Sequence, residues 1–355
     1  MSEALFTADR LLVIAEAGVN HNGDVECARR MIEVAKECGA DVVKFQTWIT
    51  DKVYSRAHSI KPEYQKAGTA NEGEYETIKR LELSFDAFRA LKAHAERVGI
   101  VMLSTPDEEE SADFLLDDLA LPLVKVASQD ITNTPFLAHL AAKGRPMIVS
   151  TGTAEMAEVA AAVAAVRVAG PDTELALLHC TSCYPAEPDA ANLRAIETLH
   201  TAFQVPVGYS DHTTGMAVAC GAVALGACIV EKHFTLSRNM PGPDQQASLE
   251  PADLSAYVRA IRDVHRAMGD GVKRPHPSEM ANRTAMRRFA VAAADLPVGH
   301  RLGRDDILLK KAAWGVPPAL VGLLLGSTLR RAVSADDRLT FDLVELPARS
   351  GTIDA

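Results

Sequence analysis

The sequence predicts an α/β fold, a (β/α)8 TIM barrel followed by a small β-rich domain. Short apolar stretches typical of buried strands alternate with helix-like stretches through residues 1–270, and eight such units can be placed without a second sheet. The 355 residues are enough for a barrel and an appendage. Polar and charged residues gather where the predicted strands end, which is the functional end of such barrels.

The first units illustrate the pattern. Residues 11–15 form an apolar strand, a polar loop covers 16–24, and residues 25–38 have a helical spacing that Gly39 ends. Further strands are expected at 41–46, 101–105, 123–128, 146–151, 175–181, 205–209 and 228–234. Helices are expected at 81–98, 108–119, 135–143, 154–169, 192–203, 216–227 and 251–268. Residues 47–80 are polar without a clear period, so we expect a long functional or mobile loop there.

The C-terminal part is predicted to be a separate domain. Gly and Pro residues interrupt the repeat at 269–282, which places the barrel at 1–270, a linker at 271–285 and the last domain at 286–355. Short strands are expected in that domain at 289–294, 307–311, 329–333 and 338–346. A domain of this size is at the low end of what folds alone, so we expect it to pack on another element.

Composition and charge exclude several functions. A net charge of −10 without any Lys/Arg block argues against nucleic acid as a partner. No apolar run approaches the ~20 residues of a membrane span, and residues 1–10 lack a signal-peptide core, which indicates a cytoplasmic protein. Cys180 and Cys183 form one Cys-x-x-Cys, but Tyr184-Pro185 follows it instead of a helix and a second pair is lacking. Neither redox nor zinc chemistry is therefore expected there.

Two histidines indicate a metal site. His212 and His233 end two successive strands joined by one helix, and parallel neighbours lie ~4.8 Å apart, so both imidazoles can reach one point. Such a pair with open positions suits a divalent metal that also holds water and substrate. The alternative is two unrelated histidines, but Ser210, Asp211 and Glu231 beside them favour a site.

Two lysines indicate an anion site. Lys44 and Lys125 lie within predicted buried strands, where an unpaired ammonium is costly. Hydroxyl residues end several neighbouring strands, and lysines with hydroxyls can bind a phosphate and a carboxylate. Two alternatives stay open. One is a structural salt bridge with Glu16 or Asp41, and the other is a Schiff-base aldolase, which the histidine pair disfavours because a metal already activates the electrophile.

Several long motifs resemble those of the sialic acid synthases, which make N-acetylneuraminate, legionaminate and related nine-carbon sugars. These motifs are Ile14-Ala15-Glu16-Ala17-Gly18-Val19-Asn20-His21-Asn22-Gly23, Val43-Lys44-Phe45-Gln46, Gly208-Tyr209-Ser210-Asp211-His212-Thr213, Glu231-Lys232-His233-Phe234 and Pro241-Gly242-Pro243-Asp244. The resemblance spans residues 11–288, and the C-terminal part resembles the family's antifreeze-like (SAF) domain. It implies condensation of phosphoenolpyruvate with an open-chain N-acylmannosamine, dependence on Mn²⁺, Mg²⁺ or Co²⁺, and a domain-swapped homodimer.

The resemblance also implies roles for individual residues. His212 and His233 match the metal ligands. The positions that match residues around phosphoenolpyruvate are Lys44, Thr105, Lys125, Ser128, Ser150, Ser182 and Ser210. Those that match the sugar subsite are Gln46, Tyr184, Asp244 and Lys311. Three positions depart from the family: Ser182 stands where many members have Asn, Asp130 replaces a commoner Glu, and Lys311 replaces an Arg that reaches the partner's sugar, losing its bidentate fork.

The implied reaction joins the alkene carbon of phosphoenolpyruvate to the sugar aldehyde, adds water to the resulting cation and releases phosphate. The catalytic candidates are His212 and His233 through the metal, and Glu16 or Glu231 for proton transfer, between which the sequence does not choose. Residues 239–251 look like the legionaminate-type members. A 2,4-diacetamido-6-deoxy acceptor is therefore expected as readily as N-acetylmannosamine.

Two other functions remain as alternatives. Another phosphoenolpyruvate-dependent aldol-type synthase, using a different aldose or a sugar phosphate, should carry an extra basic cluster, which the sequence lacks. A binding or ice-interacting protein is suggested only by the C-terminal domain. Such a protein needs a flat, repetitive Thr-rich face, and this segment has few Thr.

Overall fold

The computed structural model describes residues 5–7, 9–60 and 73–347. The chain divides into two compact units, residues 1–270 and residues 271–355. Part of the predicted loop, 61–72, lies outside the described residues, as do residues 1–4, 8 and 348–355.

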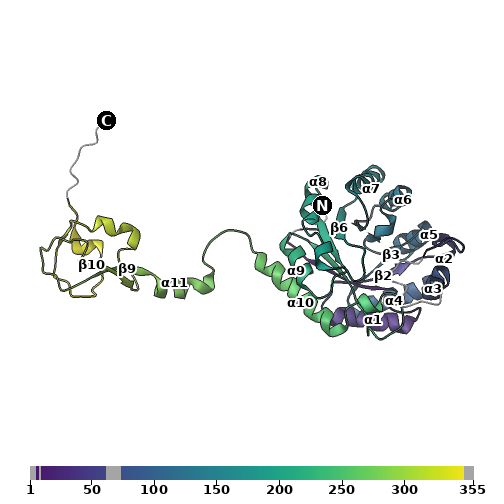
Figure 1. The fold of residues 1–355 in the computed structure, drawn as a ribbon, viewed down its shortest axis with the longest axis horizontal. Coiled ribbons are helices and arrows are strands. Elements are labelled where there is room, and N and C mark those ends of the chain that lie inside the picture. The colour runs from purple at the N-terminus through teal and green to yellow at the C-terminus, as the bar shows by residue number, and fades with distance from the viewer. Residues whose placement is uncertain (1–4, 8, 61–72, 348–355) are drawn as a thin grey trace. The chain divides into compact units, whose positions relative to one another are not determined.

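The first unit is built on an eight-stranded parallel sheet (Figure 1). Its strands are β1 (Leu12–Gly18), β2 (Val42–Thr47), β3 (Val101–Pro106), β4 (Val124–Val126), β5 (Met147–Ser150), β6 (Leu175–Cys180), β7 (Val207–Asp211) and β8 (Ile229–His233). The order β3-β2-β1-β8-β7-β6-β5-β4 places β3 and β4 at its two ends, and these two strands contact each other. The sheet therefore closes, and the predicted (β/α)8 barrel is confirmed.

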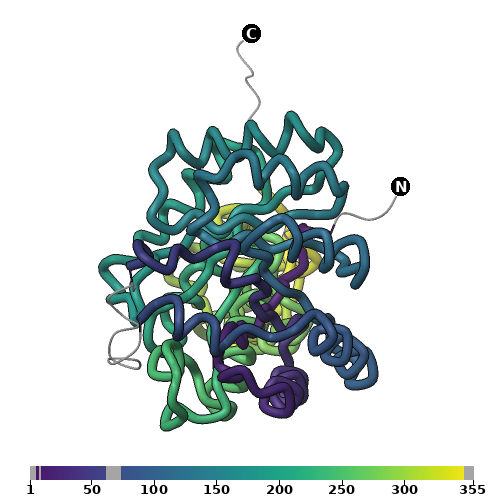
Figure 2. The backbone as a smooth tube through the Cα atoms, turned by 90° about the vertical axis from the view of Figure 1, so that its right-hand side faces the viewer, coloured from purple at the N-terminus to yellow at the C-terminus, as the bar shows by residue number. Residues whose placement is uncertain are grey.

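Helices surround this sheet (Figures 1 and 2). They are α1 (Val25–Glu37), α2 (Thr50–Val53), α3 (Glu74–Leu81), α4 (Phe85–Val98), α5 (Glu109–Asp113) continued by the π-helix Phe114–Asp118, α6 (Thr134–Ala142), α7 (Met156–Ala169), α8 (Ala195–Phe203), α9 (Ala217–Ala224) and α10 (Pro251–Met268). None of the helices in the described part of the chain is long and apolar enough to cross a bilayer.

One stretch differs from the prediction of a loop. Residues 47–80 contain α2 and most of α3. Tyr75, Ile78 and Leu81 recur at a spacing of three residues and are buried, so α3 is an amphipathic helix whose period the surrounding polar residues obscured. Ser84 caps the next helix by accepting from Ala87 N–H, so α4 begins at Phe85 and the helix predicted at 81–98 starts four residues later than expected.

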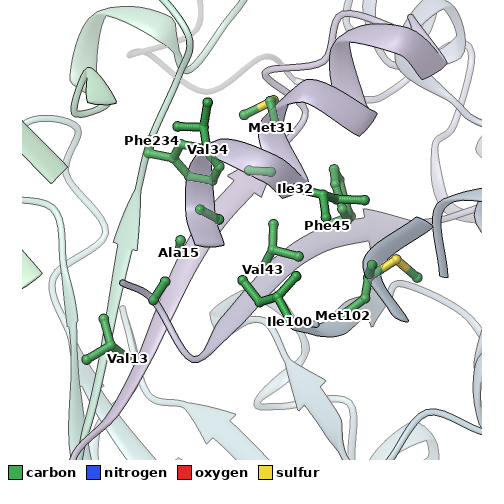
Figure 3. Packing of buried hydrophobic residues seen from close by; sticks show 14 of the residues in the cluster. Val13, Ala15, Met31, Ile32, Val34, Val43, Phe45, Ile100, Met102 and Phe234 are labelled. Atoms are coloured by element: carbon green, nitrogen blue, oxygen red, sulfur yellow. The ribbon is translucent and has the colours of Figure 1, made fainter. Parts of the chain in front are cut away.

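Side chains alternate between the two faces of each strand, and this alternation separates two cores. On β1, Val13 and Ala15 face the helices and belong to an outer cluster with Met31 and Ile32 of α1 (Figure 3). Leu12 and Ile14 face the barrel interior. The other buried members of that interior cluster are Phe6, Val42, Leu103, Leu123, Ile148, Ala176, Leu178, Cys228 and Ile229. The inner layer near the strand starts is thus apolar.

The second unit is small and rich in short strands. It contains α11 (Met280–Met286), β9 (Arg288–Ala292), β10 (Ile307–Lys311), β11 (Thr328–Leu329) and β12 (Val344–Glu345), with 3₁₀ turns at Pro277–Glu279, Pro318–Leu323 and Phe341–Leu343. The predicted linker therefore contains helical turns, because Pro277 starts a capped turn that leads into α11. The strand expected at 329–333 shrinks to β11, and the one expected at 338–346 shrinks to β12.

Candidate active site

A cavity of about 320 Å³ opens at the carboxyl ends of the barrel strands. All predicted site residues except Lys311 line it. These residues are Glu16, Lys44, Gln46, Thr105, Lys125, Ser128, Ser150, Ser182, Tyr184, Ser210, His212, Glu231, His233 and Asp244. Lys311 lies in the second unit, where it is exposed on β10 opposite Arg288 of β9.

The alternation within the strands explains why these side chains converge. Glu16 follows Leu12 and Ile14 on the inward face of β1, so the interior changes from apolar to charged toward the strand ends. The parallel register places Glu16 beside Lys44 on β2 and beside His233 on β8. Three neighbouring strands therefore each present a polar group at the same level of the barrel.

Two carboxylates and two ammonium groups form a buried network at the base of the cavity. Lys44 Nζ lies 2.8 Å from Glu16 Oε1 and 3.8 Å from Glu231 Oε1, and Lys125 Nζ lies 3.7 Å from Glu231 Oε1. None of these four side chains is more than 6% exposed. The predicted alternative of a Lys44–Glu16 salt bridge is thus present, whereas Asp41 pairs with Arg262. The attraction between opposite charges offsets part of the cost of burying the ionised groups.

Burial and neighbouring charges move the pKa values of these groups in different directions. Burial raises the pKa of Glu16 to about 7, and the charge of Glu231 adds to the rise while Lys44 opposes it. Burial opposes ionisation of Glu231 too, but Lys125 and Lys44 outweigh it and lower the pKa of that carboxyl. One carboxyl can therefore change its protonation state near neutral pH while its neighbour stays ionised.

Hydroxyls and a backbone amide form a cradle at the ends of β4, β5 and β6. Lys125 Nζ donates to Ser150 Oγ at 2.7 Å, and Gly152 N–H donates to Ser128 Oγ at 3.0 Å. A Cβ atom on Gly152 would lie 2.3 Å from Ser182 Oγ and 2.7 Å from Ser128 Oγ. The hydroxyls approach this close only because residue 152 has no side chain. An ammonium, hydroxyls and an amide N–H suit a phosphate.

The two histidines line the cavity from the ends of neighbouring strands, with their ring centroids 5.5 Å apart. His212 Nδ1 lies 2.8 Å from the Thr181 carbonyl oxygen, which can only accept, so Nδ1 carries the proton and Nε2 keeps its lone pair. His233 Nδ1 is buried without a hydrogen-bond partner among the described residues. Burial holds the pKa of His233 well below its usual range.

Other buried atoms around the cavity also lack partners in the described structure. They are Glu16 Oε2, Glu231 Oε2 and Asp244 Oδ1. Burial raises the pKa of Asp244 to about 6. Tyr184 packs its ring 3.9 Å from the His212 ring centroid, and Gln46 Nε2 donates to Glu16 Oε1 at 3.2 Å. Unpaired buried polar atoms are costly, so their concentration here marks a ligand site.

Several cavity residues were not predicted. Asp107 and Gln129 follow the strand ends that the sequence marked at Thr105 and Ser128. Burial and the charge of Asp130 raise the pKa of Asp107 well above its usual range. Cys180 also lines the cavity, with its Sγ 3.8 Å from His212 Nδ1. Its position, two residues after inward-facing Leu178, could have identified it by alternation alone.

Tyr54 and Ile78 reach the cavity from the stretch that was predicted as a loop. All six cysteines are free thiols. Within the described ranges, three or more His, Cys, Asp or Glu side chains nowhere gather as a ready metal site. A metal here would therefore have His212 and His233 as its protein ligands and take its other ligands from water or substrate.

Comparisons with known proteins identify relatives. The sequence profile of the NeuB family matches residues 31–273. The N,N'-diacetyllegionaminic acid synthase of Legionella pneumophila is 41% identical over 337 residues, which are 94% of this chain and 94% of that protein. The N-acetylneuraminate-9-phosphate synthase of Homo sapiens is 38% identical, over 94% of this chain and 92% of that protein. The crystal structure of N-acetylneuraminic acid (sialic acid) synthetase from Leptospira borgpetersenii, in complex with citrate, superimposes with a TM-score of 0.70 and 31% identity. It covers 80% of this chain and 94% of that chain.

Proposed function

This chain belongs to the NeuB family, and on that premise we propose that it condenses phosphoenolpyruvate with an open-chain N-acylmannosamine-type sugar to give a nine-carbon 2-keto acid and phosphate. It is a phosphoenolpyruvate-dependent nonulosonate synthase, and its relatives are named as synthases of legionaminic acid or of neuraminate. The observation that carries this proposal is the buried Glu16–Lys44–Glu231–Lys125 network beside the hydroxyl and amide cradle.

Phosphoenolpyruvate binds at the cradle and the two lysines. Its phosphate accepts hydrogen bonds from Ser128, Ser150 and Ser182, next to Lys125. Its carboxylate is held by Lys44 and Thr105, which already lie 3.1 Å apart. Ser210 hydrogen-bonds to Glu231 and so keeps that carboxylate oriented toward the lysines. These contacts offset the negative charge of phosphoenolpyruvate, and they become stronger as the cavity excludes water.

His212 and His233 would hold the divalent metal. His212 Nε2 and His233 Nδ1 are the atoms that fit, since the first keeps its lone pair and the second is buried without a described partner. The Thr181 carbonyl fixes the His212 tautomer, as outer partners of metal ligands commonly do. Mn²⁺, Mg²⁺ or Co²⁺ bound there would polarise the aldehyde and hold a water.

Proton transfer falls to the two glutamates. The C3 carbon of phosphoenolpyruvate bonds to the aldehyde carbon, whose oxygen needs one proton. Water then adds to the cationic C2 and releases one proton. The bond between C2 and the phosphate oxygen breaks as C2 becomes a ketone, and the proton of the new C2 hydroxyl leaves with the phosphate, which balances the reaction. Glu16, with a pKa of about 7, gives the proton and takes it back, while ionised Glu231 stabilises the cationic carbon.

The acceptor is bound by Gln46, Tyr184 and Asp244. A 2,4-diacetamido-6-deoxy mannose-type sugar is proposed as readily as N-acetylmannosamine, because a relative that is 41% identical is a diacetyllegionaminic acid synthase. Both sugars present an amide and several hydroxyls, which a carboxylate and an amide side chain can pair. Lys311 would contact the acyl group of the sugar only if the second unit covers the cavity of a barrel.

We also propose a homodimer in which the second unit, with an antifreeze-like fold, covers the cavity of the partner subunit. Apolar side chains are exposed on that unit at Leu308, Leu309 and Trp314, and exposed apolar patches commonly mark interfaces. Deleting the chain after Gly271 should abolish most turnover while the barrel still folds. A protein that is monomeric by light scattering and fully active would refute this arrangement.

Location in the cytoplasm stays a prediction, which cell fractionation would test.

The decisive experiment is an acceptor panel. The protein is incubated with phosphoenolpyruvate and Mn²⁺ plus N-acetylmannosamine, its 4-acetamido-6-deoxy analogue, unacylated mannose or arabinose 5-phosphate, and products are identified by mass. One of the N-acylated sugars should give the highest kcat/KM, because a site built to pair an amide rejects analogues without it. If arabinose 5-phosphate or mannose gives the highest value, the nonulosonate assignment fails and another aldol-type synthase replaces it.

A further inference from the structure

A buried ion pair directly behind the two histidines has no part in the chemistry proposed above. Asp211 and Lys232 are register partners at the ends of β7 and β8, and Lys232 Nζ lies 3.3 Å from Asp211 Oδ2. The two side chains are 0% and 2% exposed. Because side chains alternate along a strand, Asp211 and Lys232 point away from the cavity, while the histidine that follows each of them points into it.

Every polar group of this pair has a partner. Asp211 accepts from Tyr257 OH at 2.8 Å, from Thr213 N–H at 2.9 Å and from Thr213 Oγ1 at 2.7 Å. Lys232 donates to the Thr213 carbonyl and lies 5.7 Å from the centroid of the Tyr257 ring. Tyr257 belongs to α10, so the pair links two strands, the segment after β7 and a helix.

The network adds to the contacts that hold the chain beyond the β7–β8 ladder, where Ala186 N–H donates to the His212 carbonyl at 2.8 Å. β7 ends at Asp211, and the β7–β8 ladder ends with the Asp211–Lys232 pair, so His212 lies beyond the ladder. On the β8 side, His212 is flanked by two residues, Asp211 and Thr213, that both bond to Lys232. A shift of Lys232 would therefore move the backbone on both sides of His212 relative to His233.

Buried ion pairs are weak evidence for stability, because desolvation offsets most of their attraction, and well-packed neutral replacements are often tolerated. Fixing a geometry is an alternative reason for such a pair. We propose that the Asp211–Lys232 pair, anchored by Tyr257, positions His212 and His233 and thereby sets the geometry of the divalent-metal site. The metal part of this inference rests on the proposed function, whereas the positioning of the rings does not.

The experiment compares four variants of the full-length protein. Lys232→Met keeps the side-chain length without the charge, and Asp211→Asn with Lys232→Met removes both charges. Arg262→Met is the matched control, because Arg262 also joins α10 to the barrel, but through Asp41, which lies 2.9 Å away just before β2. His212→Gln identifies the signals of that histidine. Thermal unfolding shows whether each variant is folded.

The first readout needs no metal. In metal-free protein with ¹⁵N-labelled histidine, His212 should show a fixed Nδ1–H tautomer, because Nδ1 donates to the Thr181 carbonyl. We expect the double variant to have a Tm close to that of wild type, because it recovers most of the decrease caused by Lys232→Met alone. Its His212 Nδ1–H signal should nevertheless broaden or disappear. The second readout is Mn²⁺ affinity by electron paramagnetic resonance, which should fall about tenfold or more in the double variant. Arg262→Met should keep both properties.

Two outcomes overturn parts of this picture separately. A folded double variant that keeps the His212 signal and binds Mn²⁺ within about twofold of wild type would show that the pair is only structural. If wild type and His212→Gln bind Mn²⁺ equally, the metal part of the proposed function fails. In that case, the His212 signal in metal-free protein still tests whether the Asp211–Lys232 pair positions the ring.

Discussion

Replacement of Gly152 by Ala tests the cradle most directly. The added Cβ would lie 2.3 Å from Ser182 Oγ and 2.7 Å from Ser128 Oγ, closer than real Cβ atoms come to their neighbours, so both hydroxyls must rotate or move away. Ser128 would then lose its 3.0 Å hydrogen bond from the amide of residue 152. The nearest atoms belong to short side chains, so the barrel should still fold.

The size of the effect follows from the hydrogen bonds that the phosphate would no longer receive. A hydrogen bond to a charged group contributes about 1.5–3 kcal/mol, so losing one to the phosphate should raise KM for phosphoenolpyruvate roughly 10- to 150-fold. KM for the sugar should change little. Steady-state kinetics with each substrate varied in turn measures both constants. Gly322→Ala is the control, because a Cβ there meets no atom within 4 Å. A phosphoenolpyruvate constant within about twofold of wild type, in folded Gly152→Ala protein, would refute the cradle.

Three further predictions concern the charged groups and the metal. Activity should require a divalent ion, and chelator treatment, His212→Ala or His233→Ala should each abolish it; full turnover after chelation contradicts the metal site. Lys44→Met and Lys125→Met should each lower kcat/KM for phosphoenolpyruvate by an amount equivalent to about 1.5–3 kcal/mol. If only KM for the sugar changes, the two lysines belong to the sugar subsite. Because burial raises the Glu16 pKa from 4.5 to about 7, the folded metal-free protein holds a proton that the unfolded chain loses. Its free energy of unfolding relative to Glu16→Gln should therefore decrease as pH rises from about 4.5 to about 7, and a flat difference in chemical denaturation contradicts the shift.

The barrel was predictable because its signals are local. Strand and helix periods, and the stops at Gly39 and Gly269, mark each unit without tertiary information. The helix Pro251–Met268 and the strand Ile307–Lys311 have the predicted bounds. Helix α3 was missed because its three apolar residues lie in a polar stretch, and β11 and β12 are shorter than predicted because turns interrupt them.

The cavity was predictable to the extent that strand ends converge. The polar residues at those ends line one cavity, while the roles assigned to them stay predictions. Asp107 and Gln129 were missed because they follow the strand ends and owe their place to loop geometry, which the period of a strand does not determine. The buried contacts of Lys232 could not be predicted from the sequence either. Its tie to Thr213 depends on two strands, a loop and α10 meeting at one point.

The two ends of the cavity differ in the kind of chain that builds them. Lys44, Thr105, Lys125 and Ser150 belong to strands whose next inward layer is the apolar interior. Tyr54, Ile78 and Asp244 come from segments outside the sheet. Substitutions in those segments leave the packed interior and the lysines and hydroxyls on the strands in place. The part of the cavity built by these segments can therefore change among relatives while the groups carried by the strands are retained.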